Sequence, residues 1–334
     1  MSNTKEYYHD QIEAGERGKV HKIGWLNMPG YKPETWNPIV GCSKVSPGCD
    51  NCYAEKMAMR IPYMLEKSKS ETYHAYKNVI DKQGWNGRTS LNTDHIDRPL
   101  QWKSPRMIFV CSMSDLFHEN VPFNWIDQVY DVIDNNIGGY EPREHLYIIL
   151  TKRPERMAEY FSYRKSSHLS YGHSNVWLGV TAENQMRANE RIPILMQIPA
   201  AKRFISIEPM LTQIDISFIR NSSCSGFSPL ESHPISSPNK PFIDWVICGG
   251  ESGSKARPCH TDWVRSIRDQ CKLAGTPFFF KQWGTWCPEG TMENYSFLIP
   301  SKEKLMGKDV MTKKPIVRNH NLLDGEEYQE WPKG

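Results

Sequence analysis

The sequence predicts an α/β fold: a partial, open β/α barrel with mostly parallel strands, with an open doubly wound sheet as the alternative. Six short apolar runs recur along the chain, and each is followed at once by polar or charged residues. Continuous apolar runs of this length are typical of strands buried on both faces, as in parallel sheets. The runs begin roughly 30 to 40 residues apart, close to the ~30 residues per unit of a β/α barrel.

Each apolar run is a predicted strand, and a weaker first strand is predicted at Pro38–Gly41, which gives up to seven parallel strands. The six stronger strands are Met107–Cys111, Leu146–Leu150, Val176–Val180, Arg203–Ile207, Trp245–Cys248 and Phe278–Phe280.

Helices are predicted between these strands. Asn124 is expected to cap a helix over Trp125–Ile133, which has one broad apolar face. Pro154 suits the first position of a helix that runs to about Tyr163. Thr261 is expected to cap a helix that ends near Leu273, before Gly275.

The strand and helix pattern covers residues 35–287, which we expect to form one barrel domain. Within it, residues 221–241 are rich in Ser and Pro and are expected to be a loop insertion. Residues 1–34 are expected to be an N-terminal extension. Residues 288–334 are polar and basic and are expected to form a tail.

The composition narrows the functional classes. The 334 residues include 41 Lys and Arg against 38 Asp and Glu, so a net charge of +3 does not by itself indicate nucleic-acid binding. The chain begins with polar residues and has no apolar run of the ~20 residues that span a bilayer. We therefore expect a cytoplasmic protein without a membrane partner. The spacing of the nine cysteines shows no disulfide framework, and in that reducing compartment a cluster of cysteines is expected to bind metal or do chemistry.

The most informative motif is a group of three cysteines. Six residues separate Cys42 from Cys49, and two separate Cys49 from Cys52. Three thiolates with one open coordination position suit a cluster such as 4Fe–4S, in which one iron remains free for another ligand. A structural zinc site needs four ligands, so a zinc protein is an alternative. Its fourth ligand would come from Cys259, His260 or Cys287.

The cysteine group and the polar motifs that end the predicted strands together resemble those of the phage-associated three-cysteine-motif proteins. That family is regarded as related to the radical S-adenosylmethionine enzymes. The resemblance runs from about residue 34 to residue 287. Typical radical S-adenosylmethionine enzymes place three residues between the first two cysteines and an aromatic before the third, whereas here six intervene and Tyr53 follows Cys52. The matching motifs are Thr35–Pro38, the cysteine loop with Cys52–Glu55, Ser112–His118, Leu150–Pro154, Leu178–Asn184, Ser206–Pro209, Gly249–Gly253 and Phe279–Gly284.

The resemblance implies a 4Fe–4S cluster on Cys42, Cys49 and Cys52, with S-adenosyl-L-methionine at the open iron. It also implies an electron donor and a substrate, for which the phage association makes DNA or RNA a reasonable class. The cofactor's amino, carboxylate and ribose groups need acidic, basic and hydroxyl or amide partners. Residues of these types follow the predicted strands: Ser112, Ser114, Asp115, Lys152, Arg153, Thr181, Glu183, Asn184, Glu208 and Glu251.

Simpler roles remain open for some of these residues. Asp115, Glu183 and Asn184 can each cap the helix that follows, and paired glycines before Glu251 can serve a tight turn. A second functional hypothesis is a nucleic-acid-binding protein with a structural metal or iron–sulfur centre. In that case exposed cations would contact phosphates and a tryptophan would stack on a base. Its candidate residues are Lys152, Arg153, Arg257, Lys281, Trp283 and Trp286.

Overall fold

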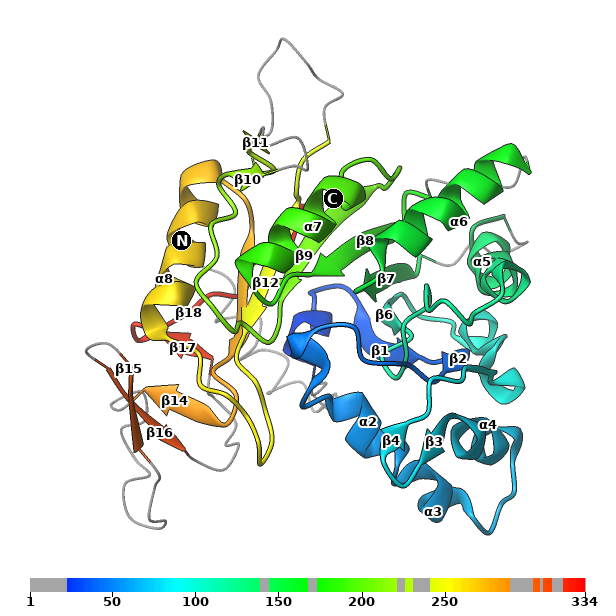
Figure 1. The fold of residues 1–334 in the computed structure, drawn as a ribbon. Coiled ribbons are helices and arrows are strands. Elements are labelled where there is room, and N and C mark those ends of the chain that lie inside the picture. The colour runs from blue at the N-terminus through cyan, green and yellow to red at the C-terminus, as the bar shows by residue number, and fades with distance from the viewer. Residues whose placement is uncertain are drawn as a thin grey trace, which may run out of the picture.

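A computed structural model describes residues 23–138, 144–167, 173–220, 226–230, 241–288, 303–306, 309–313 and 321–333. Its centre is a seven-stranded sheet that curls into half a barrel (Figure 1). All neighbouring strands are parallel, and their order in the sheet follows their order in the chain. The strands are β1 (Lys32–Trp36), β6 (Arg106–Val110), β7 (Leu146–Thr151), β8 (Val176–Thr181), β9 (Lys202–Ile207), β12 (Trp245–Gly249) and β13 (Phe278–Gln282).

The open partial barrel predicted from the sequence is therefore confirmed, and the six stronger strands are in place. The prediction of the first strand at Pro38–Gly41 is wrong. The first strand is β1, whereas β2 (Ile39–Val40) pairs antiparallel with β5 (Ser90–Leu91) outside the main sheet. Pro38 lacks the N–H that a central ladder requires, so the chain leaves the sheet after Trp36.

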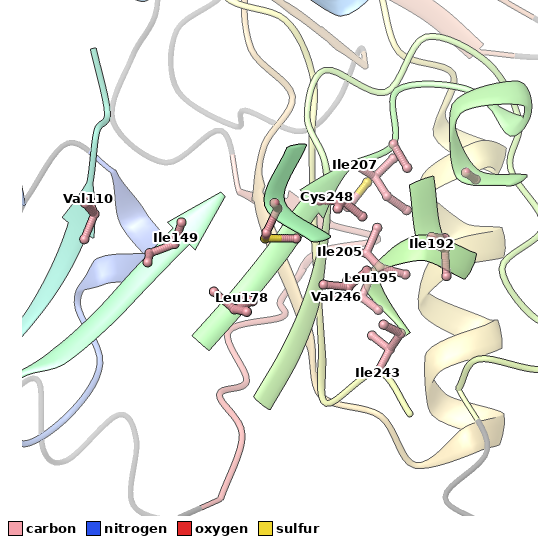
Figure 2. Close-up of a cluster of buried hydrophobic side chains, with 14 of the residues drawn as sticks. Val110, Ile149, Leu178, Ile192, Leu195, Ile205, Ile207, Ile243, Val246 and Cys248 are labelled. Carbon is pink, nitrogen blue, oxygen red and sulfur yellow. The ribbon is translucent and has the colours of Figure 1, made fainter. Parts of the chain in front are cut away.

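Both faces of the sheet are buried, as the continuous apolar runs predicted. On the outer face, side chains of the strands pack against the helices. Figure 2 shows Leu178, Ile205 and Val246 of three successive strands near Ile192 and Leu195 of α7. This face holds the larger hydrophobic core, and it fixes the strands whose carboxyl ends carry the candidate site.

The inner face is filled mainly by aromatic side chains. Trp25 packs edge-on against Phe109 and Trp245, with ring centroids 5.1 and 6.1 Å apart. Trp331 contacts Phe279 at 5.2 Å, and its Nε1 donates a hydrogen bond to the Trp25 carbonyl. Segments before residue 35 and after residue 287 therefore complete the barrel interior, beyond the domain bounds expected from the sequence.

Seven helices are found in the described residues. α6 begins at Pro154 as predicted, and α8 ends at Gly275 in a left-handed conformation. α5 begins at Phe123, so Asn124 lies inside it and is not its cap, while His260 rather than Thr261 caps α8. The helices are α2 (Tyr53–Ala58), α3 (Ile61–Leu65), α4 (Glu71–Val79), α5 (Phe123–Gly138), α6 (Pro154–Ser166), α7 (Gln185–Leu195) and α8 (Thr261–Ala274).

The remaining strands form small antiparallel pairs around the barrel. β3 and β4 lie beside α2–α4, and β14–β16 form a separate sheet near the chain's C-terminal end (Figure 1). Within residues 288–334, where the sequence suggested a polar tail, Leu323 and Met311 are buried. Part of the expected insertion, residues 221–225 and 231–240, lies outside the described residues. The small strands are β3 (Ile80–Asp81), β4 (Gly84–Trp85), β10 (Ile219–Arg220), β11 (Gly226–Phe227), β14 (Trp286–Pro288), β15 (Glu303–Met306), β16 (Asp309–Lys313), β17 (Leu322–Leu323) and β18 (Glu326–Glu327).

Candidate functional site

The three cysteines lie on a loop, residues 42–52, between β2 and α2. We call this segment the cysteine loop. Gly41 begins it with a φ of +97°, and a Cβ at that position would lie 2.3 Å from the Arg88 carbonyl oxygen. Only glycine tolerates both conditions. Pro47–Cys49 forms a 3₁₀ turn, and Cys52 occupies the N-cap position of α2.

The three thiols lie close enough to influence one another. Burial and the negative charges of Asp115, Cys52 and Cys49 raise the pKa of Cys42, the Arg153 charge opposes them, and the net result is a pKa of about 12. No three His, Cys, Asp or Glu side chains among the described residues adopt the geometry of a single-ion site. In a 4Fe–4S cluster each thiolate binds a different iron, so the sulfurs need not converge on one point. The donor set is therefore compatible with such a cluster.

Arg153 connects the first cysteine to the ends of β6 and β7. Its Nη1 lies 3.8 Å from the Cys42 Sγ and 3.2 Å from Asp115 Oδ2, and its Nη2 donates to the Ser43 carbonyl and hydroxyl oxygens. Its Nε donates to Glu119 at 2.8 Å. The guanidinium is buried and places a positive charge beside Cys42, which favours the thiolate that a metal would bind.

Asp115 joins the loops that follow β6 and β7. One carboxylate oxygen accepts from the Thr151 hydroxyl at 2.7 Å and from the Phe117 N–H, and the other accepts from the Lys152 N–H at 3.0 Å and from Arg153. Asp115 is buried, and these four hydrogen bonds use its acceptor capacity. The Asp115 carboxylate therefore positions Arg153 and has no acceptor position left for a cofactor.

His118 supports the same corner. Its Nδ1 accepts a hydrogen bond from the Asn120 N–H, so its Nε2 carries the proton and donates to the Ser43 hydroxyl at 2.8 Å. Burial and the Arg153 charge lower the pKa of His118. The ring is thus a neutral structural partner of the cysteine loop.

Glu183, after β8, holds the middle of the cysteine loop. Its Oε1 accepts from the Gly48 N–H at 3.4 Å, and its Oε2 pairs with Arg191 Nη1 at 2.9 Å. Burial acts to raise the pKa of Glu183, but Arg191 and a hydrogen bond from Ser46 outweigh it and hold the pKa below its usual value. The Glu183 carboxylate is therefore charged, and both of its oxygens take part in contacts that connect the end of β8 with the cysteine loop and with Arg191.

Glu251, after β12, holds the far end of the cysteine loop through Arg257. Arg257 donates from Nε and Nη2 to the two oxygens of Glu251, at 3.0 and 2.6 Å. The same guanidinium donates to the Pro47 carbonyl at 2.8 Å and to Asp50 at 3.2 Å. Asn51 also donates to Glu251, at 2.9 Å. We call Glu251 and Arg257 the loop clamp.

A second set of polar side chains lies along the carboxyl ends of the strands and is not used to hold the loop. Lys152 Nζ lies 3.4 Å from the Thr181 hydroxyl, and Thr181 stands opposite Ser206 in the β8–β9 register. Ser206 donates to Glu208 at 3.3 Å, and Glu208 pairs with Lys281 at 2.9 Å. We call these five residues the polar row.

Tyr53 places the polar row near the cysteines. Its ring is 55% exposed, and its hydroxyl donates to the Ser112 carbonyl at 2.8 Å. Burial of the hydroxyl raises its pKa, and the negative charges of Cys52 and Glu208 add to this effect. The Tyr53 hydroxyl therefore lies within electrostatic reach of both Cys52 and Glu208, which follows β9.

The remaining predicted residues have local structural roles. Ser112 and Ser114 donate to Asn37 and to the Ile39 carbonyl, which fastens the loop after β6 to the segment before the cysteines. Asn184 accepts from the Arg187 N–H and caps α7, the simpler of its two expected roles. Gly250 serves close packing, because a Cβ there would lie 2.0 Å from the Trp283 carbonyl oxygen.

Two parts of the alternative hypotheses are not supported by these positions. Trp283 is buried in the core and donates to the Leu322 carbonyl, so it is not available to stack on a base. Cys259 and Cys287, two of the three alternatives for a fourth zinc ligand, are both buried in the main hydrophobic core.

The sequence did not indicate two structural partners near the loop, Arg191 and Glu119, and it did not single out Ser206 and Lys281 as cofactor-binding residues. Lys281 is a candidate only under the nucleic-acid hypothesis, and Ser206 belongs only to the motif Ser206–Pro209. Both were detectable, since Ser206 lies near the end of a predicted strand and Lys281 directly follows one. Arg191 and Glu119 gave no such signal, because their contacts depend on helix and loop packing.

Comparison with known proteins gives a family assignment. Residues 22–332 match the family model described as "Protein of unknown function (DUF5131)". The chain belongs to the DUF5131 family. The curated proteins and the solved structures contain no match to it. In the part of the DUF5131 chain that the structure describes, no helix is long and apolar enough to cross a membrane.

Proposed function

We propose that this DUF5131 protein is a radical S-adenosylmethionine-type enzyme whose Cys42, Cys49 and Cys52 hold a 4Fe–4S cluster. One observation carries the proposal: the loop with the three thiols is fastened to the ends of β7, β8 and β12, beside an otherwise unused polar row. The carboxyl ends of parallel barrel strands are where such folds build their active sites.

The chain's own residues would prepare this site in two ways. Arg153 favours the Cys42 thiolate, and the loop clamp together with Glu183 holds the cysteine loop in one conformation. A cluster bound there would supply the electron that cleaves the carbon–sulfur bond of S-adenosyl-L-methionine and releases a 5′-deoxyadenosyl radical.

The polar row has the chemistry to bind the cofactor. Lys152 and Lys281 suit the carboxylate of the methionine portion, and Glu208 suits its amino group. The hydroxyls of Thr181 and Ser206 suit the ribose. We further propose an external electron donor and a cytoplasmic location, where thiols stay reduced. The substrate is proposed to be a nucleic acid or nucleobase.

The test uses anaerobically purified, reconstituted protein. We expect four irons and four sulfides per chain and slow formation of 5′-deoxyadenosine when the protein is reduced with S-adenosyl-L-methionine. Cys52→Ala should lose both the cluster and the product, because a thiolate ligand is gone. Cys259→Ala is the matched control, since that cysteine is buried in the core and should leave the iron content unchanged.

Lys152→Ala and Glu208→Ala separate cofactor binding from cluster binding. Both should weaken S-adenosyl-L-methionine binding while the cluster's absorbance is retained. A fully loaded iron–sulfur protein that neither binds nor cleaves the cofactor contradicts the proposal, and it would favour the nucleic-acid-binding hypothesis with a structural centre. If the wild type binds zinc instead of iron and Cys259→Ala loses this zinc, the result would favour the zinc hypothesis.

A further inference from the structure

The helices that follow the cysteine loop expose an unusual concentration of large apolar side chains. Tyr53, Met57, Tyr63 and Met64 are 55, 44, 81 and 75% exposed, and they make up four of the seven exposed large hydrophobic residues in the described part of the chain. All four lie within α2 and α3. Exposed apolar residues that gather in one patch mark an interaction surface, whereas single ones do not.

These side chains share one side of a nearly continuous helix. The backbone stays helical between α2 and α3, since Met59 and Arg60 both have right-handed helical φ and ψ angles and their N–H groups donate to the Glu55 and Met57 carbonyls. Positions 53, 57, 60 and 64 are separated by three or four residues, so they lie on the same face. We call this face, with Lys56 and Tyr63, the exposed stripe.

Cations are interleaved with the aromatic rings of the stripe. Lys56 and Arg60 are exposed, and Lys56 reaches Gly253 in the loop after β12. The acidic neighbours are largely paired: Glu55 with Lys44 at 3.3 Å, and Asp50 with Arg257 at 3.2 Å. Glu66, which directly follows α3, is also acidic and is exposed. The stripe therefore carries a net positive charge.

The stripe begins at the candidate site and leads away from it. Tyr53 follows Cys52 directly and donates to the Ser112 carbonyl just after β6, whereas Tyr63 belongs to α3, which lies beyond α2 (Figure 1). Ten residues of helix span about 15 Å. At ~3.4 Å per stacked nucleotide, this length matches about four or five nucleotides of a single strand.

We propose that the exposed stripe binds single-stranded nucleic acid and guides one nucleotide toward the cysteine loop. The proposal rests on the proposed function and deepens it, because it gives the surface that would bind the nucleic-acid substrate of the same site and the form of that substrate, a single strand. Alternating aromatic rings and cations are the features that bind single strands, the rings stacking on bases and the cations contacting phosphates. Tyr, Met and Arg are also enriched at protein–protein interfaces, so self-association through the stripe is one of the outcomes that the experiment distinguishes.

The experiment measures binding of fluorescein-labelled, mixed-sequence 12-nucleotide DNA and RNA by fluorescence anisotropy, using the full chain with reconstituted cluster. Tyr63→Ala should weaken binding at least fivefold, the equivalent of about 1 kcal/mol for one stacked base. Tyr63→Phe should retain binding because the ring remains. Lys56→Ala and Arg60→Ala should each reduce the slope of log affinity against log salt by about 0.7.

Matched controls come from α8, where Lys272 and Leu273 are also exposed. Lys272→Ala and Leu273→Ala should leave binding unchanged. Binding by either DNA or RNA supports the proposal, and the tighter of the two identifies the sugar. Repeating the titration with Cys52→Ala separates the two proposals, since single-strand binding should persist without the cluster.

Two results would overturn the inference. One is that the wild-type protein binds neither oligonucleotide, or that the variants of the stripe bind the oligonucleotides as tightly as the wild type does. The other is a concentration-dependent dimer in light scattering that Tyr63→Ala dissociates, which would show that a second copy of the chain covers the stripe.

Discussion

Arg257 is the residue whose loss most directly tests how the cysteine loop is held. Its guanidinium pairs with both oxygens of the buried Glu251 and also donates to Pro47 and Asp50 of the loop. Arg257→Ala would remove these contacts together and leave the Glu251 carboxylate with only Asn51 as a side-chain partner. We expect the loop to open and the folded chain to lose stability.

The magnitude follows from burial. Removing one partner of a buried ion pair costs about 3–5 kcal/mol, and the low end applies because the Arg257 side chain is 33% exposed whereas that of Glu251 is 6% exposed. The exposed pair with Asp50 adds less than about 1 kcal/mol. If a loss of about 3 kcal/mol acts on loop opening, the population of open loop rises roughly a hundredfold.

The assay is thiol labelling of the metal-free, reduced protein, followed by peptide mass spectrometry at Cys42, Cys49 and Cys52. In Arg257→Ala, labelling of Cys42 should accelerate up to about a hundredfold, because its burial depends on the closed loop. The control is Arg265→Ala, whose ion pairs with Asp262 and Asp324 are at the surface. Equal labelling rates in wild type and Arg257→Ala, with unchanged unfolding midpoints, would refute the role of the clamp.

Three further predictions concern single residues. Gly41→Ala should lower the free energy of unfolding by at least about 2 kcal/mol in urea titrations, because its φ of +97° and the 2.3 Å approach to the Arg88 carbonyl exclude a Cβ. Asn184→Ala should cost about 1 kcal/mol through the lost cap of α7 while cofactor affinity by calorimetry stays the same; a large loss of affinity would reinstate a binding role. The lowered pKa of Glu183 means that its charge stabilises the folded chain above its ordinary value of 4.5 and that this stability is lost as the pH falls through the folded pKa. Wild type should therefore lose stability more steeply than Glu183→Gln between about pH 5 and 3, and parallel curves would contradict this.

The fold was largely predictable because its strands are buried on both faces. Runs such as Leu146–Leu150 contain no polar alternation, which distinguishes a central parallel strand from an exposed one. β1 escaped prediction because Lys32–Trp36 is an edge strand with only its last residue buried. The closure of the barrel interior by Trp25 and Trp331 was also not predictable, since their contacts join residues 306 positions apart.

The candidate site was predictable in position but not in the division of roles. The predicted strand ends indicated which residues would gather at one edge of the sheet, because parallel strands bring their carboxyl ends to the same edge. Residue type could not show that Asp115 is fully hydrogen-bonded whereas Glu208 has a lysine as its salt-bridge partner. That difference depends on side chains such as Arg153 and Lys281, whose reach is set by three-dimensional packing.

The division of roles accounts for the long spacing between the first two cysteines. A short loop could be held by its own turns, but six intervening residues leave several backbone groups without local partners. Here Arg153 binds the Ser43 carbonyl, Glu183 binds the Gly48 N–H, and Arg257 binds the Pro47 carbonyl. Three strand ends thus supply the constraints that the loop cannot supply itself. It follows that a variant in which any of these three side chains is shortened should loosen the cysteines without touching them, whereas changes in the polar row should leave the loop closed.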